Sequence, residues 1–258
     1  MLNRMEASAT SQNNRAGLPD IDSYTALMNA LLDQQNNLIS NTEHIGNENQ
    51  LNDDNGALNL LALAEKAHNL LIQMENLSGV SDHYSPMGSS GSIDGSIRNT
   101  DLRPTSHHYD CVINAFANAS TVIKSNLTKN APYIAQRWLQ RMETLAFDQH
   151  SGVTPTVDSY YHVMEAFSAN GASHKLSKAP FLTQAVFDKL KQNTDLRPTA
   201  REYRLLLRTW CSSSSKDAAY NATGLWMTMQ SSLKGGIEEM EPTLEDGKTV
   251  LEAWSRAM

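Results

Sequence analysis

The chain of 258 residues carries 21 lysine and arginine residues against 28 aspartate and glutamate residues, and this formal net charge of -7 excludes a polycation built to coat nucleic acid. Residues 1–100 hold 4 basic and 12 acidic side chains, and the remainder holds 17 basic and 16 acidic ones, so the acidity belongs to the first part of the chain. No apolar run approaches the roughly eighteen residues that cross a bilayer, and no signal-peptide core follows Met1, so we expect a protein that neither spans a membrane nor is secreted.

Residues 1–16 are polar and rich in serine and asparagine, and we expect them to form a disordered lead-in. Residues 17–258 contain a recurring pattern, and the stretch TDLRPT occurs in it twice, at 100–105 and 194–199. The recurrence predicts an array of repeated units that start near residues 20, 105, 156, 199 and 243. A proline stands just before each start: Pro19, Pro104, Pro155, Pro198 and Pro242.

Each unit is predicted to open with a helix. The residue after each proline is a good N-cap, and Thr199 with Glu202 forms a capping box. Apolar residues follow at spacings of three, four and seven, which places them on one helical face. The caps are Asp20, Thr105, Thr156, Thr199 and Thr243, and a tyrosine follows four residues later as Tyr24, Tyr109, Tyr160 and Tyr203, with Gly247 in the last unit.

A second helix is predicted in the first four units. Its signature is a small residue, a large one four positions later and Met or Leu three after that: Ala67/Leu71/Met74, Ala135/Leu139/Met142, Thr183/Phe187/Leu190 and Ala222/Trp226/Met229. A helix pair alone cannot bury both apolar faces, so neighbouring pairs must stack, and the predicted fold is all-α. The last unit is expected to be incomplete, with Leu251 and Trp254 lacking a partner. Polar insertions near 37–56 and 78–100 are predicted to be disordered loops.

The closing proline, the tyrosine five residues on and the two helix signatures together resemble the pentatricopeptide repeat (PPR) family, in a divergent form with long insertions between helices. The resemblance covers residues 17–258 apart from the insertions. It implies a right-handed α-solenoid of stacked helix-turn-helix repeats that binds single-stranded RNA on its concave face. It also implies a location in the mitochondrion or plastid. Without that implication, the sequence is read as cytoplasmic.

The same resemblance assigns roles to positions on the first helices. The residue two before each tyrosine clamps a base, and these places hold Asp22, His107, Asp158, Arg201 and Glu245. The residue after the tyrosine selects the base together with the residue after the next proline. These pairs are Thr25 with Thr105, Asp110 with Thr156, Tyr161 with Thr199, and Arg204 with Thr243, and Lys248 takes the corresponding place in the last unit. Only Thr25 is a usual base-reading residue for the family, and acids at these places repel phosphate.

One charged stripe stands out, because Arg197, Arg201, Arg204 and Arg208 are spaced four, three and four apart and so share a helical face. It is interpreted either as an anion site for RNA phosphate or for an acidic partner segment, or as a solvated face partly neutralised by Glu202 and Asp195. Tyr161 is a candidate for stacking on a base, or for packing beside Tyr160.

Catalytic and cofactor signatures were also sought. No spacing of His or Cys suits zinc, no Gly-rich loop suits phosphate and no nucleophile constellation is evident, so no enzyme activity, cofactor, metal or small-molecule substrate is predicted. Cys111 and Cys211 are expected to be buried thiols. The leading hypothesis is an RNA-binding helical-repeat protein in organelle RNA metabolism, meaning processing, stability or translation. The alternative is a protein-binding α-solenoid scaffold without RNA readout, which the acidic groove positions and the net charge favour.

Overall fold

The computed structural model describes residues 19–44, 54–80, 100–120, 126–148, 151–174, 178–235 and 240–257. Within these residues there is no strand, so the all-α prediction is confirmed, whereas the predicted lead-in 1–16 lies outside them. The helices of the described part are α2 (Ile21–His44), α4 (Asp54–Ser78), η3 (Thr100–Leu102), α5 (Ser106–Ser120), η4 (Asn126–Asn130), α6 (Ala131–Ala146), α7 (Val157–His174), α8 (Ala179–Gln192), α9 (Ala200–Cys211), α10 (Ala218–Lys234) and α11 (Leu244–Ala257).

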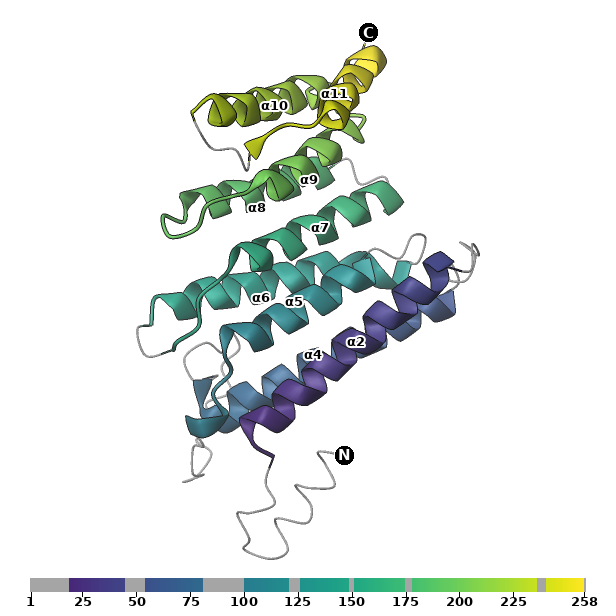
Figure 1. Ribbon diagram of the computed structural model, residues 1–258. Coiled ribbons are helices and arrows are strands. Elements are labelled where there is room, and N and C mark those ends of the chain that lie inside the picture. The colour runs from purple at the N-terminus through teal and green to yellow at the C-terminus, as the bar shows by residue number, and fades with distance from the viewer. Residues whose placement is uncertain are drawn as a thin grey trace, which may run out of the picture.

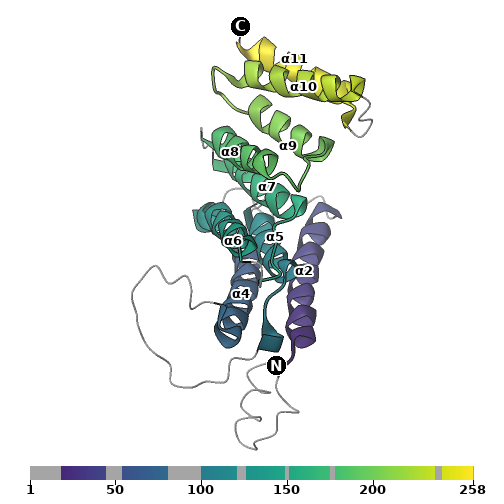
Figure 2. The ribbon, with the colours of Figure 1, turned by 90° about the vertical axis from the view of Figure 1, so that its left-hand side faces the viewer.

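The helices are arranged as a stack that follows chain order from one end of the molecule to the other (Figures 1 and 2). We call α2, α5, α7, α9 and α11 the first helices and α4, α6, α8 and α10 the second helices. Each first helix packs on the second helix that follows it and on the next first helix, and each second helix also packs on the next first helix. The predicted pairing of helices is therefore observed.

Every first helix begins one residue after its predicted cap. The Thr199 backbone N–H donates to Glu202 Oε2 at 2.7 Å and the Thr199 side chain accepts from the first turn, which completes the predicted capping box. Thr243 and Asp246 exchange the same pair of bonds, at 2.8 and 3.2 Å. Because a cap depends only on residues three positions apart, it could be predicted from the sequence alone.

At two further caps, the partner three positions on is a residue that sequence reasoning did not assign to capping. Thr156 and Ser159 exchange backbone-to-side-chain bonds at 2.9 and 3.1 Å. The Thr105 backbone N–H donates to Nδ1 of His108 at 3.1 Å. In each case the residue three positions after the cap satisfies the backbone N–H of the cap, which the helix itself leaves unpaired.

The tyrosine of each unit is buried, and in two units its hydroxyl group reaches the preceding second helix. Tyr109 donates to Glu75 Oε1 at 2.6 Å, and Glu75 also accepts from Arg141 on α6 at 3.1 Å. Burial, together with the Glu75 charge, raises the pKa of Tyr109. Each such tyrosine thus fastens its helix to the unit before it.

An equivalent triad lies one unit further on. Tyr160 donates to Glu143 Oε1 at 3.1 Å, and Glu143 Oε2 lies 2.7 Å from Lys189 Nζ on α8. Cys111 and Cys211 are both buried, as expected. Burial raises the pKa of the Cys111 thiol to about 12 and that of Cys211 to about 11, which keeps both protonated and unreactive.

The prediction of a disordered loop over 37–56 is wrong at both of its ends. Helix α2 continues to His44 and α4 begins at Asp54. Leu38 and Ile39 pack against the core, and the buried Gln35 side chain donates to the carbonyl oxygens of Leu60 and Ala115 at 2.8 and 3.2 Å. These apolar and amide contacts stabilise two extra turns that the polar composition of the segment obscured. Residues 45–53, and 81–99 of the second insertion, lie outside the described residues.

The expectation that Leu251 and Trp254 of the last helix lack a partner is partly met. Val250 and Ala253 are buried, whereas Leu251 is 71% exposed and Trp254 is 43% exposed. Trp254 nevertheless has a partner, because its indole N–H donates to Thr223 Oγ1 on α10 at 2.9 Å. No helix among the described residues is both long and apolar enough to cross a bilayer.

The capping boxes can be tested with Thr199→Ala. The change removes the acceptor for a first-turn N–H, so we expect the free energy of unfolding to fall by about 1 kcal/mol, measured as a lower urea midpoint at an unchanged slope. Thr194→Ala is the matched control, since Thr194 is an exposed turn residue in the same TDLRPT stretch. It should change the free energy of unfolding by less than about 0.5 kcal/mol. Equal losses in the two variants would contradict the assigned role.

Candidate functional site

The predicted binding residues all lie on first helices. Thr25 is on α2, Asp110 on α5, Tyr161 on α7, Lys248 on α11, and Arg201, Arg204 and Arg208 share α9. The structure does not gather them into one pocket. It brings most of them, unit by unit, against the start of a neighbouring first helix.

Thr25 meets the buried His108 of the next unit, with Thr25 Oγ1 and His108 Nε2 2.9 Å apart. Because Nδ1 of His108 accepts from the Thr105 backbone N–H, Nε2 carries the ring proton and donates it to Thr25. The Thr25 hydroxyl group in turn donates a hydrogen bond to the carbonyl oxygen of Ile21 at 2.8 Å. Burial, with a smaller effect from His107, lowers the pKa of His108 to about 4, so the imidazole is neutral.

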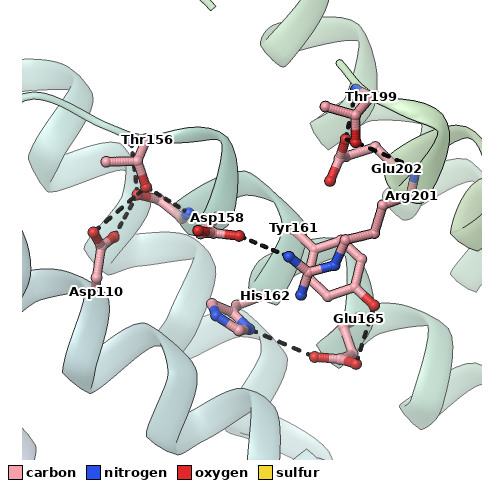
Figure 3. Close-up of polar contacts among 10 residues, drawn as sticks. Asp110, Thr156, Asp158, Tyr161, His162, Glu165, Thr199, Arg201 and Glu202 are labelled. Atoms are coloured by element: carbon pink, nitrogen blue, oxygen red, sulfur yellow. Dashed lines mark hydrogen bonds and ion pairs between the residues drawn. The ribbon is translucent and has the colours of Figure 1, made fainter. Parts of the chain in front are cut away.

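Asp110 occupies the same place one unit on. Its carboxylate accepts from the Ser159 hydroxyl group and, at 3.4 Å, from Thr156 Oγ1 (Figure 3). Asp110 and Thr156 are the pair that the family resemblance assigns to base selection, and here they are hydrogen-bonded to each other. Burial raises the pKa of Asp110, although the bonds from Ser159 and Thr156 oppose that rise.

Tyr161 forms the most distinctive contact of the row. The Arg201 guanidinium group lies over the Tyr161 ring, 3.4 Å from its centroid, and Nη1 of Arg201 donates to Asp158 Oδ1 at 2.7 Å (Figure 3). Tyr161 donates through its hydroxyl group to Glu165 Oε1 at 3.4 Å, and Glu165 Oε2 lies 3.5 Å from His162 Nδ1. The Arg201 and Asp158 side chains are 51% and 64% exposed, so this cluster lies at the surface.

Arg204 points in the other direction along the stack. Its Nε donates to Asp246 Oδ2 of the next first helix at 3.0 Å, and its Nη2 donates to the carbonyl oxygen of Glu241 at 2.7 Å. Burial tends to raise the pKa of Asp246, but the bonds from Thr243 and Arg204 outweigh it and lower that pKa. The buried Asp246 carboxylate is therefore charged and paired.

These contacts follow one rule in three of the four joints between first helices. The residue after the tyrosine bonds to the residue three positions after the next cap, as Thr25 does with His108, Asp110 with Ser159 and Arg204 with Asp246. In the remaining joint, the Tyr161 ring forms a cation–π contact with Arg201, which stands two positions after its cap. We call these contacts the unit joints.

The arginine stripe is consequently divided. Arg201 is directed to α7 and Arg204 to α11, while Arg197 and Arg208 are exposed. Lys248 is exposed as well and lines a cavity of about 640 Å³ between α10 and α11, beside Trp226. In the described part of the chain, no three His, Cys, Asp or Glu side chains lie close enough to hold a metal ion.

The protonation state of His108 gives a pH-dependent test. On acidification from pH 6.5 to about 4, the unfolded chain gains a proton on this residue and the folded protein does not, so folding becomes less favourable. Relative to His108→Gln, wild type should lose up to about 3 kcal/mol of unfolding free energy across this range, measured by urea denaturation at each pH. Thr194→Ala, which changes no titratable group, is the control and should keep a constant difference from wild type across this range. A constant gap between wild type and His108→Gln would refute the lowered pKa and the neutral state assigned to His108.

Comparisons of the chain with protein-family models, with curated proteins and with solved structures found no match in any of the three.

Proposed function

We propose that this chain is a helical-repeat protein of the pentatricopeptide type, a right-handed α-solenoid that binds single-stranded RNA along its row of first helices. The recurring cap, tyrosine and helix pair support the family resemblance, and the serial packing of the helices is compatible with it. Organelle RNA metabolism, in processing, stability or translation, is the setting that the resemblance implies. The observation that carries the proposal is the stacked pair of Tyr161 and Arg201.

This pair has two properties that RNA binding requires. One face of the guanidinium group rests on the Tyr161 ring, and because about half of the Arg201 side chain is exposed, we expect a base to reach the other face. RNA bases stack on such arginine planes as they do on aromatic rings. The Asp158 carboxylate holds the guanidinium group in place, so little side-chain freedom remains to be lost when a base stacks on it.

Binding through this pair is expected to be independent of base sequence. Thr25, Asp110 and Arg204 stand where the family reads bases, but each of them already forms a hydrogen bond across a unit joint. A base that used them would have to break a hydrogen bond for each one it made, which leaves little net gain. The exposed Arg208 and Lys248 can instead contact phosphate, which carries no sequence information.

A protein-binding scaffold of the same fold is the second candidate, and the acidic residues favour it. Asp22, Asp158 and Glu245 are exposed at three of the clamping places, and the chain as a whole carries a net charge of -7. Such carboxylates oppose phosphate but suit a basic protein segment.

The RNA proposal is tested by combining Arg201→Gln with Arg208→Gln. Arg208→Gln removes a phosphate contact and should reduce the slope of log affinity against log salt by about 0.7, whereas Arg201→Gln removes the stacking plane and should weaken binding at every salt concentration. Fluorescence anisotropy with labelled oligouridylate and oligoadenylate measures both affinity and slope. Lys66→Gln is the matched control, because Lys66 is an exposed cation on α4, the second helix of the first unit.

Tyr161→Leu removes the ring beneath Arg201. The affinity for both RNA probes should fall by at least about fivefold, since base stacking contributes roughly 1–3 kcal/mol. Unchanged circular dichroism would show that the variants fold. If the wild-type protein does not bind RNA even at low salt, the RNA function is ruled out. A protein partner that co-purifies with wild type and is lost with Asp158→Asn would then establish the scaffold function.

A further inference from the structure

Three successive second helices expose an aromatic side chain at the same place. Tyr133 on α6, Phe181 on α8 and Tyr220 on α10 are each the third residue of their helix and stand two positions before the small residue of the second-helix signature. Their exposed fractions are 42%, 51% and 76%. A large aromatic side chain at this degree of exposure in three units in a row is a repeated surface feature, and core packing does not explain it.

Two of these rings are held in a fixed orientation. Tyr133 packs edge-to-face on Phe167 of α7 at a centroid distance of 5.4 Å, and Phe181 packs in the same way on Trp210 of α9 at 5.0 Å. Both inner rings are buried, at 2% exposure each. The buried ring thus fixes the outer ring while about half of the outer side chain remains in solvent, so the outer ring is preorganised.

An exposed lysine accompanies each ring. Lys129 precedes Tyr133, Lys178 precedes Phe181 and Lys216 precedes Tyr220, by four, three and four residues. The helix starts that carry these residues lie along the same side of the stack (Figure 1). We call the three aromatic residues and three lysines the aromatic edge. The first unit does not share it, because Glu65 takes the equivalent place on α4.

We propose that the aromatic edge is a second binding surface for single-stranded RNA, with bases on the rings of Tyr133, Phe181 and Tyr220 and phosphates beside the lysines. Non-specific single-strand sites combine these two elements, because every base has a face that can stack and every nucleotide carries a charge. A proline-rich peptide would also suit exposed rings, but it offers nothing to the lysines. The repeated pairing of a cation with each ring therefore favours RNA.

This inference rests on the proposed RNA function and extends it. The unit joints use polar atoms of the first helices, whereas the aromatic edge lies at the starts of the second helices. An RNA strand that contacts both surfaces gains affinity from the second because that contact is then intramolecular. The aromatic edge also adds no base reading, so binding remains independent of sequence.

The test is the triple variant Tyr133→Leu/Phe181→Leu/Tyr220→Leu. Leucine keeps apolar contact with Phe167 and Trp210 and has a higher helix propensity than tyrosine or phenylalanine, so the fold should survive, as circular dichroism can verify. Affinity for labelled oligouridylate and oligoadenylate should fall by at least about tenfold, since each lost stack alone accounts for about fivefold or more. The control Tyr133→Phe/Tyr220→Phe retains the rings and should bind as wild type does.

The lysines are tested separately with the double variant Lys178→Gln/Lys216→Gln. The variant should remain folded, and its slope of log affinity against log salt should be smaller than that of wild type by about 1.4. Photocrosslinking of the bound strand should label peptides that contain Phe181 or Tyr220. If wild type binds RNA and the leucine triple variant binds equally well, the aromatic edge is overturned and the function proposed for the first helices stands. If Arg201→Gln/Arg208→Gln has no effect while the leucine variant loses binding, the edge is the RNA site and the first-helix proposal fails. Absence of RNA binding by wild type overturns both.

Discussion

The unit joint is the interaction on which the stack depends. A helix pair has two apolar faces and can align with its neighbour in several ways that bury similar area, so burial alone leaves their relative position poorly fixed. Hydrogen bonds are directional, and the bond from Ser159 to Asp110 or from Arg204 to Asp246 forms only when one helix start lies beside the right turn of the preceding first helix. The residue that caps the start of a helix from three positions inside it therefore also sets where that helix lies on the preceding unit. Glu75 and Glu143 reinforce this alignment from the second helices, each accepting from a tyrosine and a cation of the following unit.

This construction has a consequence for recognition. A residue whose polar atoms hold two units together is poorly placed to read a ligand, because it must give up an existing bond to do so. What remains for binding is surface that the joints do not use: the outer face of Arg201, the exposed Arg208 and the rings of the aromatic edge. These are the surfaces on which the proposed binding of RNA depends.

The sequence predicted the parts of this structure that depend on local spacing. Five helix starts were placed to the residue, because each requires only a cap after a proline and an apolar face that follows it. The length of α2 was missed, since Gln35 is held by Leu60 and Ala115, residues far along the chain whose approach no local pattern reveals. His108 and Ser159 were missed for a different reason. Neither is a usual capping-box residue, and each is held by a hydrogen bond to the preceding first helix that no local pattern reveals. The residues of the first-helix row were on the correct helices, but their pairing with one another across units is a tertiary property.

Serial packing also has a consequence for how the chain acquires this structure. The principal contacts of every α-helix in the described part are with α-helices one or two positions away along the chain, so contacts between distant parts of the sequence are few. Chains of low contact order fold quickly, because little loop entropy is lost before a contact forms. During synthesis, each helix pair can therefore dock on the completed units before it as it leaves the ribosome, without waiting for the end of the chain. The buried faces of α2 and α4 would in this way be covered by α5 early in synthesis, which shortens the time for which they are open to aggregation.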